Sequence, residues 1–460
     1  MEEEKLFEEE RTNRLEGNHE AQMKVFSSLL ENCKDAESTL LLIKLLAKKK
    51  NQIKLTVRWL FQTIKKNYEL KSYPKEFPKE NVAFFTTILK ELIEGKLFLE
   101  QERIDYAQYL KNIYEHYNFY TEALQITYDV PIETFSTIKL EDILKYQLDT
   151  LRLAIICQDT AKAEILSKKT KEKHLTDKKL LWLLRTDYFT LSGNYLKATK
   201  EIMKIVEDST VLNTTSHHSI NQAVKSNLNI KTQENSDVNT FKFKHFFEIY
   251  SQQNLNQVLV QQASLNAILA KNSEINVQDE NLIAIHDKSE LRSRKECLKK
   301  ERVNWLKKLK MNVHNVEKMR DMIDLFLRPD IISKDKCVKQ ILAIIQEHRI
   351  IENTENILKL IGTAINLHNL EILQSCFKSI SFSDLESLLQ SPIELLLELI
   401  TNIGSEFCKI DQRGQFLHFN HQQEIDETET LKVLDETVMF CTKEKLRRKI
   451  EKERNEQLSE

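Results

Sequence analysis

Glycine and proline are scarce in this sequence, with 6 and 5 residues respectively among 460. Both residue types interrupt helices, and turn-rich β proteins use them heavily. Leu, Ile, Lys and Glu are abundant instead, which is typical of helices joined by short connections. The sequence therefore predicts an almost wholly α-helical chain, and it argues against all-β and dinucleotide-binding α/β architectures.

No residue pattern points to an enzyme. The closest pair of glycines is Gly404 and Gly414, so no glycine-rich loop can hold a phosphate, and nucleotide hydrolysis is excluded. The nearest pairing of a nucleophile with a base is Cys376 with His368, and the two would lie about two turns apart on one helix. We interpret Cys376 as a core residue and expect no catalytic activity.

Metal-binding and disulfide patterns are missing as well. His217 and His218 lie in a polar stretch, and His418 and His421 lie near a turn. Neither pair completes the three or four ligands that zinc requires. The seven cysteines are scattered without a CxxC pair, which favours a reducing compartment. We expect no cofactor or metal, and a location in the cytoplasm and nucleus.

Neither charge nor hydropathy favours a nucleic-acid or membrane protein. The 68 basic residues nearly balance the 70 acidic ones, so no global field attracts polyanions. The chain begins with acidic residues at 2–4, unlike a signal peptide. Apolar runs such as Leu40–Leu46, interrupted by Lys44, are too short to span a bilayer. We expect a soluble protein that recognises its partners through local surfaces.

An internal repeat is the most informative feature of the first half. Ala123, Ala163 and Ala198 each lie in a second helix that follows a helix with apolar residues three or four positions apart. The alanines recur after 40 and then 35 residues. Small residues at such positions let helices pack closely in tetratricopeptide-like solenoids. An ordinary helical bundle with coincidental spacing is the alternative, and both architectures are all-α.

Composition and periodicity divide the chain into segments. Residues 207–240 are rich in Asn, Ser, Thr and Gln, which predicts a polar insertion or loop. The predicted segments are a helical-repeat solenoid at 1–206, the insertion at 207–240, further helices at 241–369, a small module at 370–420 and a C-terminal helix at 421–460.

The small module has the pattern of a winged helix. A short helix at Ser383–Leu389 precedes a helix with a predicted capping box at Ser391, Pro392 and Glu394. Strands at 408–410 and 416–419 then flank a turn. The third helix has acidic residues and no Lys or Arg, so we expect it to contact protein rather than DNA.

Solenoid, winged helix and terminal helix together resemble the PCI family, the scaffold subunits shared by the proteasome lid, the signalosome and a translation initiation factor. Local segments that resemble a lid member of that family are LLAKKKNQIKLTVRWL from Leu45, EGKLFLEQERIDYAQYL from Glu94, IETFSTIK from Ile132, ILSKKT from Ile165 and HNLEILQSCFKSISFSDLESLL from His368. Residues 210–350 depart from the family.

The resemblance implies a scaffold subunit of the 26S proteasome regulatory-particle lid, working in ubiquitin-dependent degradation. The implied partners are other lid subunits and also the ATPase ring and the core particle. Edge-to-edge pairing of the wing and packing of the terminal helix would use Phe416, Leu417, His418, Phe419, Leu431, Leu434 and Val438. The terminal stripe could instead dock within the chain.

Two alternative functions stay open on the sequence. The equivalent PCI subunit of the signalosome is suggested by IYE from Ile113 and PIETF from Pro131. A nucleic-acid-binding winged-helix adaptor would use residues 288–310, where ten positive and three negative side chains surround Trp305. Basic runs are more often solvated helix faces, so we do not expect a nucleic-acid partner.

Overall fold

The protein is described from a computed structural model, and its fold is almost entirely helical. The structure describes residues 2–33, 35–175, 178–211, 255–273, 288–312, 317–348, 354–403 and 407–420. The chain divides into two compact units. Unit 1 comprises residues 1–273, 300–320 and 345–352, and unit 2 comprises 274–299, 321–344 and 353–460.

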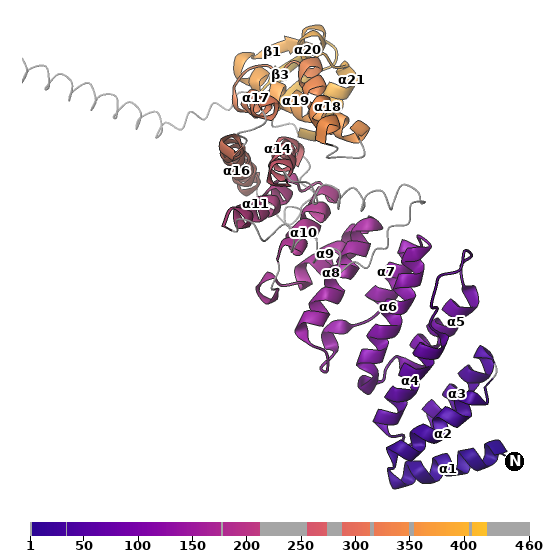
Figure 1. Ribbon diagram of the computed structural model, residues 1–460. Coiled ribbons are helices and arrows are strands. Elements are labelled where there is room, and N and C mark those ends of the chain that lie inside the picture. The colour runs from indigo at the N-terminus through magenta and orange to yellow at the C-terminus, as the bar shows by residue number, and fades with distance from the viewer. Residues whose placement is uncertain are drawn as a thin grey trace, which may run out of the picture. The chain divides into compact units, whose positions relative to one another are not determined.

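Unit 1 is a series of antiparallel helical hairpins that follow one another along the unit (Figure 1). Its helices are α1 (Glu2–Glu16), α2 (His19–Glu31), α3 (Ala36–Lys48), α4 (Lys54–Tyr68), α5 (Lys79–Thr87), α6 (Glu100–His116), α7 (Tyr120–Tyr128), α8 (Leu140–Ile156), α9 (Thr160–Lys169), α10 (Lys179–Leu191), α11 (Tyr195–Val211) and α14 (Leu255–Ser273). Short helices are η1 (Ile88–Ile93), η2 (Leu97–Leu99), η3 (Ile132–Thr134) and η4 (Glu172–His174). This arrangement confirms the predicted helical solenoid.

One turn geometry recurs in the hairpins α6–α7, α8–α9 and α10–α11. A left-handed residue ends the first helix, and the next N–H donates to the carbonyl five residues earlier. The left-handed residues are Asn118 (φ 63°), Gln158 (φ 56°) and Gly193 (φ 74°). The N–H to carbonyl distances are 2.8 Å for Phe119 to Tyr114, 3.0 Å for Asp159 to Ala154 and 2.8 Å for Asn194 to Phe189. This bond closes helix ends in the Schellman motif.

The recurring alanine lies five residues after each left-handed residue. Ala123, Ala163 and Ala198 are 0%, 1% and 0% exposed, so each is enclosed in the packing of the hairpins. The same turn joins α1 to α2 at Gly17, but there Gln22 takes the alanine's place and is fully buried. The sequence pattern did not predict this hairpin because Gln22 hides the repeat.

Helix α14 continues the solenoid after the polar segment. It packs against α11, and the Thr199 hydroxyl lies 3.3 Å from the carbonyl oxygen of Ala263. The predicted insertion at 207–240 overlaps α11, which extends to Val211, and its remainder lies outside the described residues. Helices α11 and α14 therefore pack against each other although they are far apart in the sequence.

Helices α16 (Lys288–Asn312), α17 (Glu317–Leu327) and α18 (Lys334–His348) each cross a boundary between the two units. The rest of unit 2 that the structure describes is a winged helix. Its elements are α19 (Thr354–Cys376), β1 (Ser379–Ser381), α20 (Phe382–Leu389), α21 (Ile393–Ile403), β2 (Cys408–Asp411) and β3 (Phe416–Phe419). The strands form an antiparallel sheet in the order β1-β3-β2, and the predicted winged helix is confirmed.

An apolar core holds this module together. Its buried residues are Leu370, Leu373, Ile380, Leu385, Leu389, Leu396, Ile400, Cys408, Leu417 and Phe419. Strand β1 was not predicted, because three residues are too few for an alternating pattern. The predicted capping box is also wrong: α21 begins at Ile393, and the buried Ser391 hydroxyl lies 3.2 Å from Asn366 Oδ1 and 2.9 Å from Lys334 Nζ.

Candidate interaction surfaces

The predicted wing residues alternate between the core and the surface. Phe416 is 42% exposed and His418 is also exposed, with their rings 6.4 Å apart. Leu417 is fully buried and Phe419 is 5% exposed. Because successive strand side chains point to opposite faces, only the first pair can contact a partner. The proposed partner contacts of Leu417 and Phe419 were therefore wrong.

Strand β2 forms one of the two edges of the sheet that the structure describes. Strand β3 is central, paired with β1 on one side and β2 on the other, so it cannot join a neighbour's sheet. The register pairs Lys409 with His418, and the Asn420 N–H donates to the Phe407 carbonyl. Since hydrogen-bonded pairs alternate along antiparallel strands, the peptide groups of Cys408 and Ile410 point to the open edge. Such unpaired groups can bind another strand.

The other predicted partner-binding residues, Leu431, Leu434 and Val438, lie outside the described residues.

The basic stretch at 288–310 forms part of α16, and several of its charges are already paired. Lys308 Nζ lies 2.5 Å from a Glu207 carboxylate oxygen, and Lys299 Nζ lies 3.4 Å from one of Glu371. Arg302 is only 3% exposed. Lys308 also lies 4.9 Å from the centre of the Trp305 ring. These contacts leave fewer free cations for phosphates than the sequence suggested.

Cys376 and His368, the nearest pairing of a nucleophile with a base, do not form a reactive site. Cys376 is exposed, so its interpretation as a core residue was wrong. His368 is the buried member of the pair: its Nε2 lies 3.3 Å from the Asp330 carbonyl oxygen, and its ring contacts Phe326. Within the described residues, no group of three potential metal ligands gathers, and no helix is long and apolar enough to cross a membrane.

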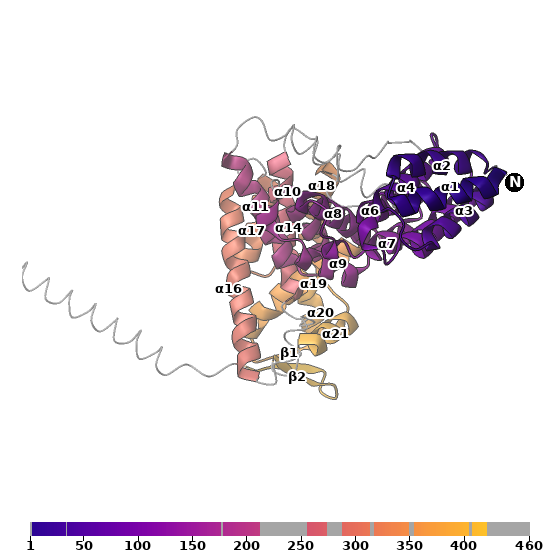
Figure 2. The ribbon, with the colours of Figure 1, turned by 90° about the horizontal axis from the view of Figure 1, so that it is seen from below.

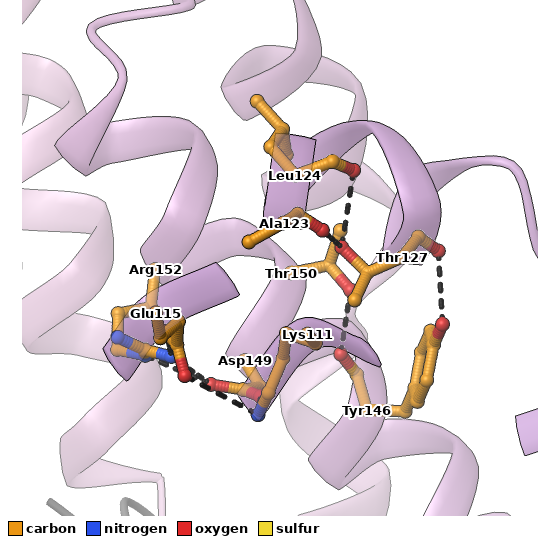
Figure 3. Close-up of polar contacts among 9 residues, drawn as sticks. All are labelled: Lys111, Glu115, Ala123, Leu124, Thr127, Tyr146, Asp149, Thr150 and Arg152. Carbon is orange, nitrogen blue, oxygen red and sulfur yellow. Dashed lines mark hydrogen bonds and ion pairs between the residues drawn. The ribbon is translucent and has the colours of Figure 1, made fainter. Parts of the chain in front are cut away.

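The solenoid surfaces are held in place by buried polar contacts that the sequence did not reveal. Between α6 and α8, Asp149 contacts Lys111 and Arg152, and Arg152 also contacts Glu115 (Figure 3). Burial alone would raise the pKa of Asp149, but the two cations lower it below the usual value. This network joins α6 to α8, two helices that α7 separates in the sequence.

Hydrogen bonds complete the same junction (Figure 3). The Tyr146 hydroxyl donates to the Thr127 carbonyl at 3.0 Å, and the Thr127 hydroxyl donates to the Ala123 carbonyl at 3.0 Å. Tyr146 belongs to α8 and the other two residues to α7. Polar side chains thus tie three consecutive helices together around the buried alanine.

Comparable contacts recur elsewhere in unit 1. Glu10 is fully buried, and its carboxylate accepts hydrogen bonds from Lys49 at 2.7 Å and Gln52 at 3.1 Å. Glu102 contacts Arg58 at 3.1 Å and Gln62 at 2.9 Å. Because each contact joins residues far apart in the sequence, these carboxylates align successive hairpins.

Comparison with known proteins identifies a family that the solenoid resembles. Residues 3–221 match the family model described as PSMD12/CSN4, N-terminal, and this range includes α2 to α11. This segment of the chain is similar to the PSMD12/CSN4 N-terminal family. Most of the local segments in which the sequence resembled non-ATPase regulatory subunit 12 lie within it. That recognition is confirmed.

Relatives of this chain carry proteasome names. The chain is 29% identical over 169 residues to 26S proteasome non-ATPase regulatory subunit 12 homolog A of Arabidopsis thaliana, covering 36% of this chain and 37% of the relative. It is 24% identical over 165 residues to 26S proteasome regulatory subunit RPN5 of Saccharomyces cerevisiae, covering 36% of each. The alignments thus span little more than a third of these relatives.

Proposed function

We propose that this chain is a structural scaffold subunit of the 26S proteasome regulatory-particle lid and serves ubiquitin-dependent degradation in the cytoplasm and nucleus. The observation that supports it is the joining of a PSMD12/CSN4 N-terminal solenoid to a winged helix with an open sheet edge. The relatives reported above are named as proteasome regulatory subunits, one of them as non-ATPase. The function proposed here is assembly rather than catalysis.

Each unit has its own part in this proposal. The solenoid would reach toward the ATPase ring and the core particle, because stacked hairpins offer an extended surface. The winged helix would join neighbouring lid subunits through β2, because an open antiparallel edge can extend into another sheet. The signalosome remains the alternative assembly, since the family description includes CSN4.

The composition of the native complex tests this proposal. The full chain, tagged and expressed at its natural level, is purified gently and its partners are identified by mass spectrometry. Lid subunits in stoichiometric amounts are the expected result. Signalosome subunits in their place would favour the alternative, and a chain that purifies alone would contradict both.

A substitution at the sheet edge tests how the winged helix joins its neighbours. Ile410→Pro removes an N–H that points to the open edge and spares the bonds between β2 and β3. We expect the purified variant to recover roughly tenfold fewer neighbouring subunits. Ile410→Ala loses similar packing but keeps the N–H, so it should recover them normally. Equal losses in both variants would argue against strand pairing.

A further inference from the structure

Helix α21 carries more leucine than its own module buries. Leu396 and Ile400 lie in the core of the winged helix. The neighbouring Leu395 is 55% exposed, and Leu388 on α20 is 42% exposed. The two helices contact each other and lie side by side in both views (Figures 1 and 2). Single exposed leucines are common, so the charges around these two decide what they would bind.

Those charges are all of one sign. The sequence contains no Lys, Arg or His from Ser379 to Phe407. Four carboxylates on α20 and α21 are exposed: Asp384, Glu386, Glu394 and Glu398. Within the described part of the winged helix, the three glutamates form no ion pair. Uncompensated carboxylates beside apolar side chains favour a partner that supplies both cations and apolar groups.

We propose that the acidic leucine face, made of Asp384, Leu388, Glu394, Leu395 and Glu398, binds a basic amphipathic helix of a partner protein. Leucines on the two helices would contact the apolar stripe of that helix. Lys and Arg beside the stripe would pair with the carboxylates. Nucleic acid and anionic membranes carry the wrong charge for this face, and a neutral helix would leave the carboxylates without partners.

This inference deepens the proposed function by naming the chemistry of one partner, and it does not depend on which assembly the chain joins. The acidic leucine face is also separate from the open edge of β2, because α20 and α21 contribute no strand to the sheet. Loss of strand pairing and loss of helix binding are therefore distinguishable in experiment.

The experiment measures binding of a defined peptide to the purified full chain. The probe is a fluorescein-labelled helical peptide of roughly 18 residues, with leucine along one stripe and lysine elsewhere, and its binding is followed by anisotropy. A matched peptide carries glutamate in place of lysine. We expect the lysine peptide to bind with an affinity that falls as salt rises, and the glutamate peptide to bind at least roughly tenfold more weakly.

The chain offers a closely matched control. Glu394→Lys with Leu395→Ser changes the first turn of α21, and Leu140→Ser with Glu141→Lys makes the same exchange in the first turn of α8. Leu140 is 51% exposed, close to the value for Leu395. The α21 variant should bind the lysine peptide at least roughly tenfold more weakly than the α8 variant does. Equal affinities of the two variants, or no binding by the original chain, would overturn the proposal.

A photoreactive residue in place of Leu395 tests the same face in the native complex. Cross-links to a segment rich in Lys and Arg would support the proposal and identify the partner. Cross-links to an acidic segment or to this chain, or none at all, would count against it. The variant Glu398→Lys provides a check that needs no change of leucine, because it should abolish the same cross-link while the module keeps its helical circular dichroism.

Discussion

The solenoid and the winged helix of this chain are stabilised in different ways. In the solenoid, the buried Glu10 and the partly buried Asp149 bond to side chains of other helices. In the winged helix, the main cluster of buried residues is apolar, and the exposed Glu386, Glu394 and Glu398 form no ion pair within the described residues. Buried ionic networks resist sliding between helices because each partner must keep its place. We infer from this contrast that the solenoid keeps its helices at fixed positions, and that the winged helix offers a surface for binding.

The largest expected effect comes from breaking one ionic network. Arg152→Ala leaves the carboxylates of Asp149 and Glu115 partly buried beside Lys111 alone. We expect the free energy of unfolding to fall by about 3–5 kcal/mol, because one partner of a buried pair is removed. Denaturant unfolding followed by circular dichroism would measure the loss.

An exposed ion pair in the same unit provides the control. Lys145 lies 3.9 Å from Asp142, and both side chains are more than half exposed. Lys145→Ala should change the unfolding free energy by less than about 0.5 kcal/mol. A loss as large as that of Arg152→Ala would mean that burial does not distinguish the two pairs.

The corresponding test in the winged helix targets its apolar core. Leu417→Ala removes a fully buried side chain from the central strand. It should cost about 2–5 kcal/mol, seen as faster hydrogen exchange at 379–419 with unchanged exchange at 140–205. Phe416→Ala on the same strand should cost less than about 1 kcal/mol. Faster exchange in both segments would show that the two regions unfold together.

A third substitution asks whether every carboxylate in the solenoid stabilises it. Burial raises the pKa of Asp187 to about 7, so the charged form is disfavoured in the folded protein. This group favours folding only when protonated, and that contribution disappears as the pH rises through about 7. Asp187→Asn should therefore stabilise the chain at pH 8 by about 1–3 kcal/mol, less than the full shift implies because Asp187 is partly exposed.

Thermal melts at two pH values would check this prediction. The advantage of Asp187→Asn should vanish near pH 4 and below, where the original carboxyl is largely neutral in both the folded and the unfolded chain. A variant with the same gain at both pH values would indicate a packing effect instead of a charge effect. The charge of Asp187 would then not account for the gain.

The sequence predicted the architecture well, because its signals are local. The spacing of Ala123, Ala163 and Ala198 reflects a turn repeated within each hairpin, and the winged helix follows from its helix and strand patterns. The wing was only half predicted, although the signal was available. Alternation along 416–419 requires one pair of side chains to face the core, and the polar His418 favours Leu417 and Phe419 as that pair.

Other features could not be predicted from local patterns. The contact between Lys111 and Asp149 joins residues 38 positions apart, and that between Glu10 and Gln52 joins residues 42 apart. Each residue is an ordinary charged or polar one in an amphipathic helix, and only the packing of the hairpins brings the partners together. The edge position of β2 likewise depends on β1, because β1 pairs with the other side of β3. Strand β1 is too short for the sequence pattern to reveal it.

The smallest expected effect concerns the turn that the solenoid repeats. Gln158 has φ 56° at the position where Gly193 has φ 74°, and a side chain there is strained. Gln158→Gly should stabilise the chain by about 0.5–1 kcal/mol, and Gly193→Ala should destabilise it by a similar amount. Gln158→Ala is the control, because it keeps a β-carbon and should give no gain. If all three variants had the same melting temperature, the conformation of the turn would not limit the stability of the hairpins. The polar contacts between helices would then be the feature that distinguishes the solenoid from the winged helix.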